Sequence, residues 1–101
     1  MNDLKYYKVK SLRKLGNTGA ASKLITEMNE QRSEMEKNLV DNYAKFGASD
    51  KNVQQSNLKY FSGLIEELKG NSQAANSCFA EALRLDPGNI WAAFMSKGKT
   101  H

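Results

Sequence analysis

Residues 60–87 read YFSGLIEELKGNSQAANSCFAEALRLDP, and this stretch decides the fold class. Its apolar residues recur at helical intervals, namely Phe61, Ile65 and Leu68, then Ala75, Phe79 and Ala82. Gly70 lies between the two sets, where a glycine can adopt the left-handed conformation that ends a helix. Pro87 cannot continue a helix and biases Asp86 away from helical geometry. The stretch therefore predicts a helical hairpin followed by a sharp turn.

The same pattern occurs earlier in the chain, at a constant offset of 54 positions. The matched residues are Tyr6-Tyr7 with Tyr60-Phe61, Gly16-Asn17 with Gly70-Asn71, and Ala21, Ile25 and Met28 with Ala75, Phe79 and Ala82. A single hairpin cannot bury its apolar face alone, so repeated hairpins stack on one another. We therefore expect an all-α fold built from two stacked hairpins.

Residues 56–91 resemble the tetratricopeptide repeat family. The motifs that carry the resemblance are Tyr60-Phe61-Ser62-Gly63, Leu68-Lys69-Gly70-Asn71, Ala75-x3-Phe79 and Ala82-Leu83-x-Leu85-Asp86-Pro87. The resemblance implies that the hairpins stack right-handedly into an α-α superhelix. It also implies that the small residues Gly63, Ala75 and Ala82 let two helices approach closely. The arrangement is similar to the C-terminal repeat segments of larger bacterial proteins of undetermined function.

The first unit departs from the family pattern. Val9 stands where the second unit has Gly63, and the final Asp-Pro is missing. The family period is about 34 residues, so an offset of 54 leaves about 20 extra residues, which lie between Met28 and Asp50. We expect residues 1–101 to form one domain of about five helices. Its parts are unit one at about 3–46, unit two at about 53–86 and a capping helix at about 89–96.

The extra residues leave two interpretations open. Residues 29–34 are all polar, but none of them is a strong helix breaker. We therefore expect one unusually long second helix that projects past its neighbours for about a turn and a half; the alternative is a break within this segment. Ser49 or Asp50 is then expected to cap the third helix.

Catalytic chemistry has no visible carrier in this sequence. His101 is the only histidine, and Cys78 lies on an apolar stripe, where we expect a buried structural thiol. Glu66 and Glu67 are adjacent, and neighbouring positions on a helix do not face each other. The segment 16–19 lacks the Lys-Ser/Thr sequel of a phosphate loop. We expect no enzyme activity, no metal site and no cofactor.

A binding role follows from the resemblance. Such repeats line a concave groove with the first helix of each hairpin, and they bind a protein or peptide there. The residues expected on this surface are Tyr6, Lys10, Arg13, Asn57, Tyr60 and Leu64. Tyrosine and arginine often contribute binding energy at interfaces. The alternative is that Tyr6 and Tyr60 are core residues packed between the hairpins.

Two further functions remain open. Trp91 and Phe94 lie near one end of the stack, where an exposed apolar face could join two copies into a homo-oligomer or serve as a structural module that packs within a larger protein. The first helix is basic, with Lys5, Lys8, Lys10, Arg13 and Lys14, whereas residues 27–36 hold four glutamates and one arginine. These two helices could attract each other, or the basic one could bind an anionic partner. Nucleic acid is a disfavoured partner, because the net charge is only +4 and this basic patch has no aromatic residues for base stacking beyond Tyr6 and Tyr7.

The composition indicates an ordinary globular protein, with 40% apolar and 26% charged residues. No apolar run approaches the ~18 residues of a membrane span, and the N-terminal residues lack a secretory h-region. The single cysteine excludes an internal disulfide. We expect a cytoplasmic protein without membrane partners, or a fragment of a larger chain.

Overall fold

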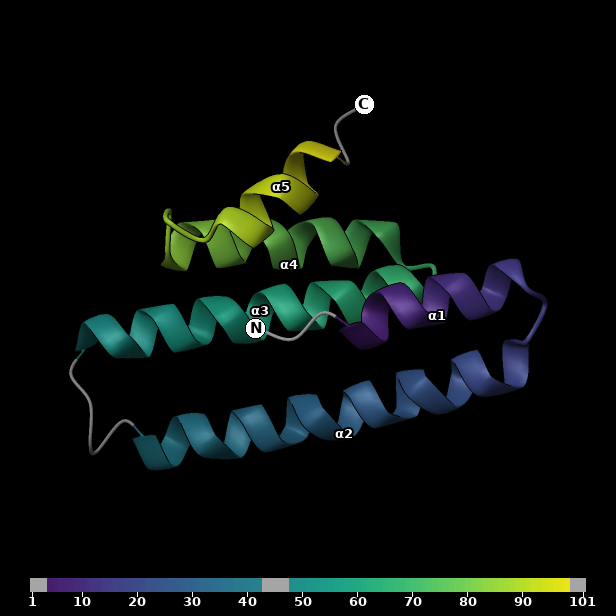
Figure 1. Ribbon diagram of the computed structural model, residues 1–101. Helices are drawn as coiled ribbons and strands as arrows, with labels where there is room; N and C mark the ends of the chain where they lie inside the picture. The colour runs from purple at the N-terminus through teal and green to yellow at the C-terminus, as the bar shows by residue number, and fades with distance from the viewer. Residues whose placement is uncertain (1–3, 43–47, 99–101) are drawn as a thin grey trace.

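The computed structural model describes residues 4–42 and 48–98 (Figure 1). In this part of the chain it contains five α-helices and no strand, so the all-α prediction is confirmed. The helices are α1 (Leu4–Lys14), α2 (Thr18–Asn42), α3 (Ala48–Leu68), α4 (Ser72–Leu85) and α5 (Ile90–Gly98).

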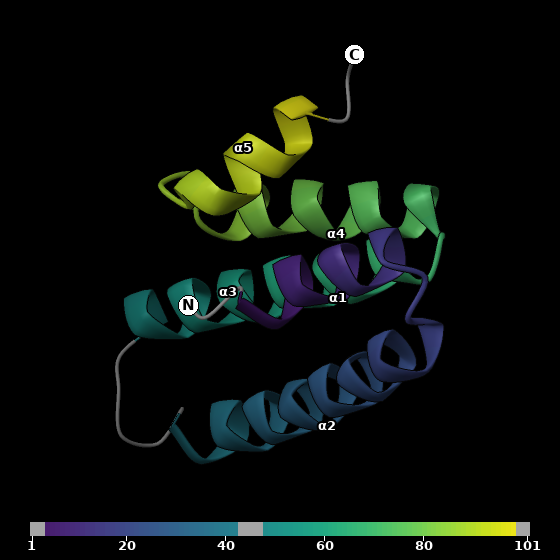
Figure 2. The same cartoon turned by 45° about the vertical axis from the view of Figure 1, so that its right-hand side comes forward.

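Helix α3 lies at the centre of the molecule. The hairpin α1–α2 packs on one side of it and α4 lies along another side, with α5 on α4 (Figures 1 and 2). The extents of 45 × 31 × 19 Å describe a slab elongated along the helices. Because α3 has neighbours on several sides, its apolar residues are covered almost all round. Tyr60, Phe61, Leu64, Ile65 and Leu68 are all buried.

The two glycines predicted to end helices both do so, with the same backbone geometry. Gly16 has φ +79° and Gly70 has φ +88°, in the left-handed region that favours glycine. The amides of Gly16 and Asn17 donate to the carbonyls of Arg13 and Leu12, at 3.0 and 2.9 Å. The amides of Gly70 and Asn71 donate to those of Glu67 and Glu66, at the same two distances. Both turns are therefore Schellman motifs, separated by the 54-residue offset of the sequence.

The caps that follow these turns differ. Asn17 Oδ1 accepts a hydrogen bond from the Ala20 amide at 3.2 Å and so caps α2. Asn71 precedes α4, but its side chain donates to Glu66 Oε2 at 2.8 Å and does not cap the helix. The asparagine after the glycine therefore caps the next helix in the first hairpin, whereas the Asn71 side chain in the second hairpin joins the turn to α3.

Helices α3 and α4 approach each other closely at Gly63, as the resemblance implied. A Cβ atom at Gly63 would lie 2.5 Å from Cε1 of Phe79, which is closer than carbon atoms can pack. Phe79 is fully buried there, between Ala75 and Ala82, which are equally inaccessible. The absence of a side chain at position 63 therefore makes room for the ring that joins α4 to α3.

The second helix is long and unbroken, which settles the alternatives left open by residues 29–34. However, α3 begins at Ala48 rather than near residue 53, so Ser49 and Asp50 lie inside the helix and do not precede it. The early start places α3 beside the far part of α2 (Figures 1 and 2), and Leu39 is buried there. The expectation that α2 projects alone past its neighbours was wrong, because α3 is lengthened to match it.

Candidate protein-interaction groove

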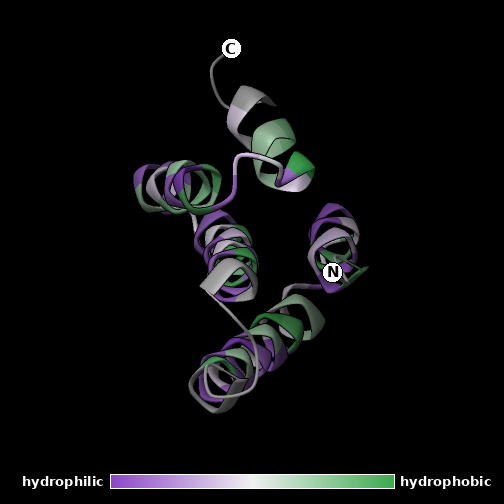
Figure 3. Ribbon diagram, turned by 90° about the vertical axis from the view of Figure 1, so that its left-hand side faces the viewer, coloured by the Kyte–Doolittle hydropathy of each residue, from purple (hydrophilic) through white to green (hydrophobic). Residues whose placement is uncertain are grey.

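An apolar groove of about 320 Å³ lies between α1 and α5. Its lining residues are Tyr7, Tyr60, Ile90, Trp91 and Phe94. In Figure 3, which looks roughly along the helices, α1 and α5 both lie to the right of α3 and α4 lies to its left. The groove therefore opens on the face made by the first helix of each hairpin and by the last helix.

Four of the lining side chains are large, apolar and open to solvent. Tyr7 and Trp91 expose 52% and 50% of their surface, and Ile90 and Phe94 expose 69% and 68%. Tyr60 is buried and forms the floor. Single exposed apolar residues are ordinary, but a group of four around one depression is typical of an interaction site.

A buried polar network holds α5 in position beside the groove. Ser56 Oγ donates to the Ala82 carbonyl at 2.6 Å and accepts a hydrogen bond from Asn89 Nδ2 at 2.8 Å. Asn89 Oδ1 accepts from the Ala92 amide at 3.1 Å and so caps α5. One asparagine thus joins the start of α5 to α3 and, through Ser56, to α4. In the turn that precedes Asn89, the Asp86 carboxylate accepts a hydrogen bond from the Gly88 amide at 3.0 Å.

The opposite wall is fixed by an aromatic pair on α1. The rings of Tyr6 and Tyr7 meet edge to face, with centroids 5.0 Å apart and planes at 79°. Tyr6 is buried and its hydroxyl donates to Glu67 Oε1 at 2.5 Å. Tyr60 on the floor packs against Phe79, at a centroid distance of 6.0 Å. Tyr7 and Tyr60, the two tyrosines that line the groove, therefore pack against the buried residues Tyr6 and Phe79.

The six site residues expected from the sequence are buried, half-buried or exposed. Tyr6, Tyr60 and Leu64 expose 1%, 2% and 0% of their surface, which fits the alternative that the tyrosines are core residues. Only Tyr60 among the six lines the groove. A role for these side chains in partner binding stays a prediction.

The other three expected site residues are polar. Lys10 pairs with Glu67 at 3.5 Å, and its ammonium lies 4.9 Å from the centroid of the Tyr6 ring. Asn57 is half-buried and accepts a long 3.5 Å hydrogen bond from Asn89. Arg13 is exposed on α1. Of these, Lys10 and Arg13 remain accessible to a partner.

The sequence did not single out Tyr7 and Ile90, and it assigned Trp91 and Phe94 to the end of the stack. The sequence does contain a signal for an apolar face on α5, because Ile90 and Phe94 are four residues apart and share one side of the helix. Placing that face beside α1, however, requires the direction of α5, which Asn89 and Ser56 set through tertiary contacts.

The basic and acidic helices do not meet as simple complementary faces. Lys10 pairs with Glu67 of α3, and Lys5 Nζ donates to the amide oxygen of Gln31 on α2 at 3.4 Å. Lys8, Arg13 and Lys14 are exposed. Much of the positive charge of α1 therefore faces solvent on the same helix that forms one wall of the groove.

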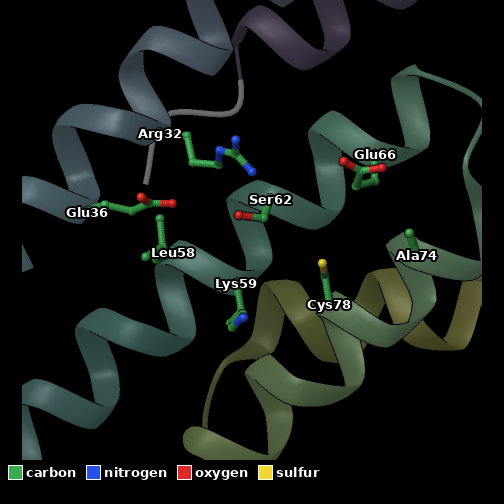
Figure 4. Close-up of a pocket in the computed structure, with 8 residues that line it drawn as sticks. All are labelled: Arg32, Glu36, Leu58, Lys59, Ser62, Glu66, Ala74 and Cys78. Carbon is green, nitrogen blue, oxygen red and sulfur yellow. The ribbon is translucent and has the colours of Figure 1, made fainter.

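A second depression, of about 370 Å³, lies between α2, α3 and α4 (Figure 4). It is lined by Arg32, Glu36, Leu58, Lys59, Ser62, Glu66, Ala74 and Cys78. The Arg32 side chain extends from α2 toward α3, and its Nε atom is buried without a hydrogen-bond partner among the described residues (Figure 4). The lining of this depression contains two cations and two carboxylates, so it favours neither anions nor cations as ligands.

Cys78 is half-buried in this depression and not fully buried, which corrects the expectation of a core thiol. Desolvation by burial raises the pKa of the Cys78 thiol, outweighing the opposing effect of Lys59. Because the thiolate is the nucleophile, this cysteine is a weak one at neutral pH.

Within residues 4–42 and 48–98, no group of three or more His, Cys, Asp or Glu side chains is placed to hold a metal ion. No helix in this part of the chain is long and apolar enough to cross a membrane. Comparison with protein-family models, curated proteins and solved structures gave no match. The resemblance to tetratricopeptide repeats therefore rests on the sequence motifs alone.

Proposed function

We propose that this chain is a non-catalytic module that binds a protein or peptide in the groove between α1 and α5. The observation that carries the proposal is the group of exposed apolar side chains Tyr7, Ile90, Trp91 and Phe94 around one depression. Tryptophan and tyrosine are enriched among the residues that dominate interface energies. Covering the exposed part of each such side chain would contribute about 1–2 kcal/mol to binding.

We also propose that the hairpins stack right-handedly, as in tetratricopeptide repeats. Two observations support this architecture. The turns at Gly16 and Gly70 share one hydrogen-bond pattern at the repeat offset, and α3 packs on both helices of the preceding hairpin. In such a stack, α1, α3 and α5 would be the equivalent first helices, and the groove would lie on their shared concave face.

The test is capture of a partner by the wild-type chain and by a Trp91→Ala/Phe94→Ala variant. Both side chains are at least half exposed, so we expect the variant to remain helical by circular dichroism. Leu15→Ala is the matched control, because Leu15 is 81% exposed and lies outside the groove. A partner retained by the wild type and the control but lost by the double variant supports the proposal. Equal capture by all three proteins contradicts it.

Self-association is a second candidate, favoured by the exposure of Ile90, Trp91 and Phe94 on α5, the last helix of the stack. An exposed apolar end tends to pair with a copy of itself. Sedimentation of the wild type and the double alanine variant over a range of concentrations distinguishes the two functions. A dimer that the variant abolishes favours self-association, whereas a monomer at all concentrations eliminates it.

A further inference from the structure

We infer that the occupant of the groove is an acidic, amphipathic segment of a partner protein. Its apolar side chains would enter between α1 and α5, and its carboxylates would face α1. This inference rests on the proposed function and adds the chemical class of the partner. It is carried by the charge of the two helices that wall the groove.

Neither wall contains a carboxylate. The sequence of α1 is LKYYKVKSLRK, with five cations and no Asp or Glu, and that of α5 is IWAAFMSKG, again without an acid. Glu67 of α3 lies beside α1, where it accepts a hydrogen bond from the Tyr6 hydroxyl and pairs with Lys10. The charges that the two wall helices themselves carry are therefore all positive, which favours negatively charged partners over basic ones.

The cations continue the apolar surface along α1. Tyr7, Lys10 and Lys14 are spaced i, i+3 and i+7, so they lie on one face of the helix. The distance from Tyr7 to Lys14 along the axis is about 10 Å, at 1.5 Å per residue. A helical segment lying along α1 would thus meet the aromatic groove first and the ammonium groups of Lys10 and Lys14 about one and two turns further on. This order of anchors and charges matches an amphipathic helix docked in a groove.

The same charge disfavours a second copy of this chain as the occupant. In a symmetric dimer built on this face, the α1 helices of both copies would lie in one interface. Each brings five cations and no acid, so like charges would gather there, which is destabilising. A partner with acidic residues gains from the field that a dimer would have to overcome.

The experiment selects displayed random peptides on the whole wild-type chain, with counter-selection on the Trp91→Ala/Phe94→Ala variant. The peptides are about 15 residues long, enough for about four helical turns. We expect the retained sequences to combine large apolar residues with an excess of Asp and Glu. Retained sequences that need Trp91 and Phe94 but carry no acidic excess overturn this inference and leave the proposed function standing. If no sequence depends on these two residues, both fail.

The charge dependence is then measured directly with a retained peptide that lacks tryptophan. Trp91 is the only tryptophan of the chain, so its emission reports the groove alone. We expect Lys14→Glu to weaken binding by about threefold or more, and high salt to reduce the difference from wild type. Lys37→Glu, at an exposed position on α2, is the control and should leave binding unchanged.

Equal affinity of the wild type and the α1 charge variant overturns the inference. A shift of Trp91 emission with protein concentration, in the absence of peptide, also overturns it, because a second copy would then occupy the groove.

Discussion

The hairpins α1–α2 and α3–α4 have the same type of turn, but they differ in which helix carries the larger core side chain. In the second hairpin, Gly63 leaves room for the large ring of Phe79. At the equivalent positions of the first hairpin, Val9 is fully buried and the smaller Ile25 packs against the core. The hairpin with the smaller residue on its first helix thus has the larger residue on its second helix. Well-packed cores tolerate substitutions that conserve total volume in this way.

The surroundings of the two hairpins differ as well. Helix α3 is covered by α1, α2 and α4, whereas α1 packs mainly on α2 and α3. The uncovered face of α1 carries Tyr7 and the exposed cations Lys8, Arg13 and Lys14. The same repeat pattern therefore produces a core helix at the centre of the molecule and a partly exposed helix at its edge.

The largest difference between the hairpins is expected when the paired side chains are truncated. Phe79→Ala should lower the free energy of unfolding by about 3–5 kcal/mol, because it opens a cavity next to Gly63. Ile25 is only partly buried, so Ile25→Ala should cost about 2 kcal/mol or less. Urea unfolding followed by circular dichroism measures both. Equal losses would mean that the two hairpins contribute alike to the core.

Transplanting the pair of the first hairpin into the second tests the exchange of volume. Gly63→Val alone should cost about 1–3 kcal/mol, because its side chain would collide with the Phe79 ring. Adding Phe79→Ile should recover most of that loss, because the smaller isoleucine side chain leaves room for a valine at position 63. The same unfolding measurement is used. A double variant no more stable than Gly63→Val would show that the two positions do not compensate each other.

Helix α5 depends on a polar network beside the second hairpin. Ser56→Ala removes the acceptor of Asn89 and a donor to the Ala82 carbonyl, and should cost about 1–2 kcal/mol. Trp91 emission should shift to longer wavelength as α5 loosens, while amide exchange in α2 stays unchanged. Ser33→Ala, at an exposed position on α2, is the control. Unchanged stability and emission would refute the positioning role of Ser56.

The smallest effects are expected at the shared turns, and they should be equal. Gly16→Ala and Gly70→Ala each force an alanine into a positive-φ conformation, which should cost about 1 kcal/mol. Gly19→Ala should instead stabilise the chain by up to about 1 kcal/mol, since Gly19 lies in α2 with open space around it. Thermal unfolding of the three variants checks this. Clearly unequal losses at Gly16 and Gly70 would mean that the two turns differ in strain despite their common geometry.

The sequence by itself determined the elements that depend on nearby residues. The close approach at Gly63 was implied by the resemblance, whereas the helix ends at Gly16 and Gly70, the sharp turn at Pro87 and the repeat offset were predictable from the residues themselves. Each of the latter follows from backbone conformation or from the spacing of apolar residues along one helix. The early start of α3 was not predictable in this way, because residues 48–53 carry no strong apolar stripe and are held beside the long α2.

Only the tertiary structure decided which residues form the candidate site. Tyr6 and Tyr7 are adjacent and chemically identical, yet one is buried on Glu67 and the other lines the groove. Likewise, Cys78 belongs to an apolar stripe but lies at the edge of a depression. Helical periodicity gives the face on which a side chain lies, but whether a neighbouring helix covers that face depends on contacts between residues far apart in the chain.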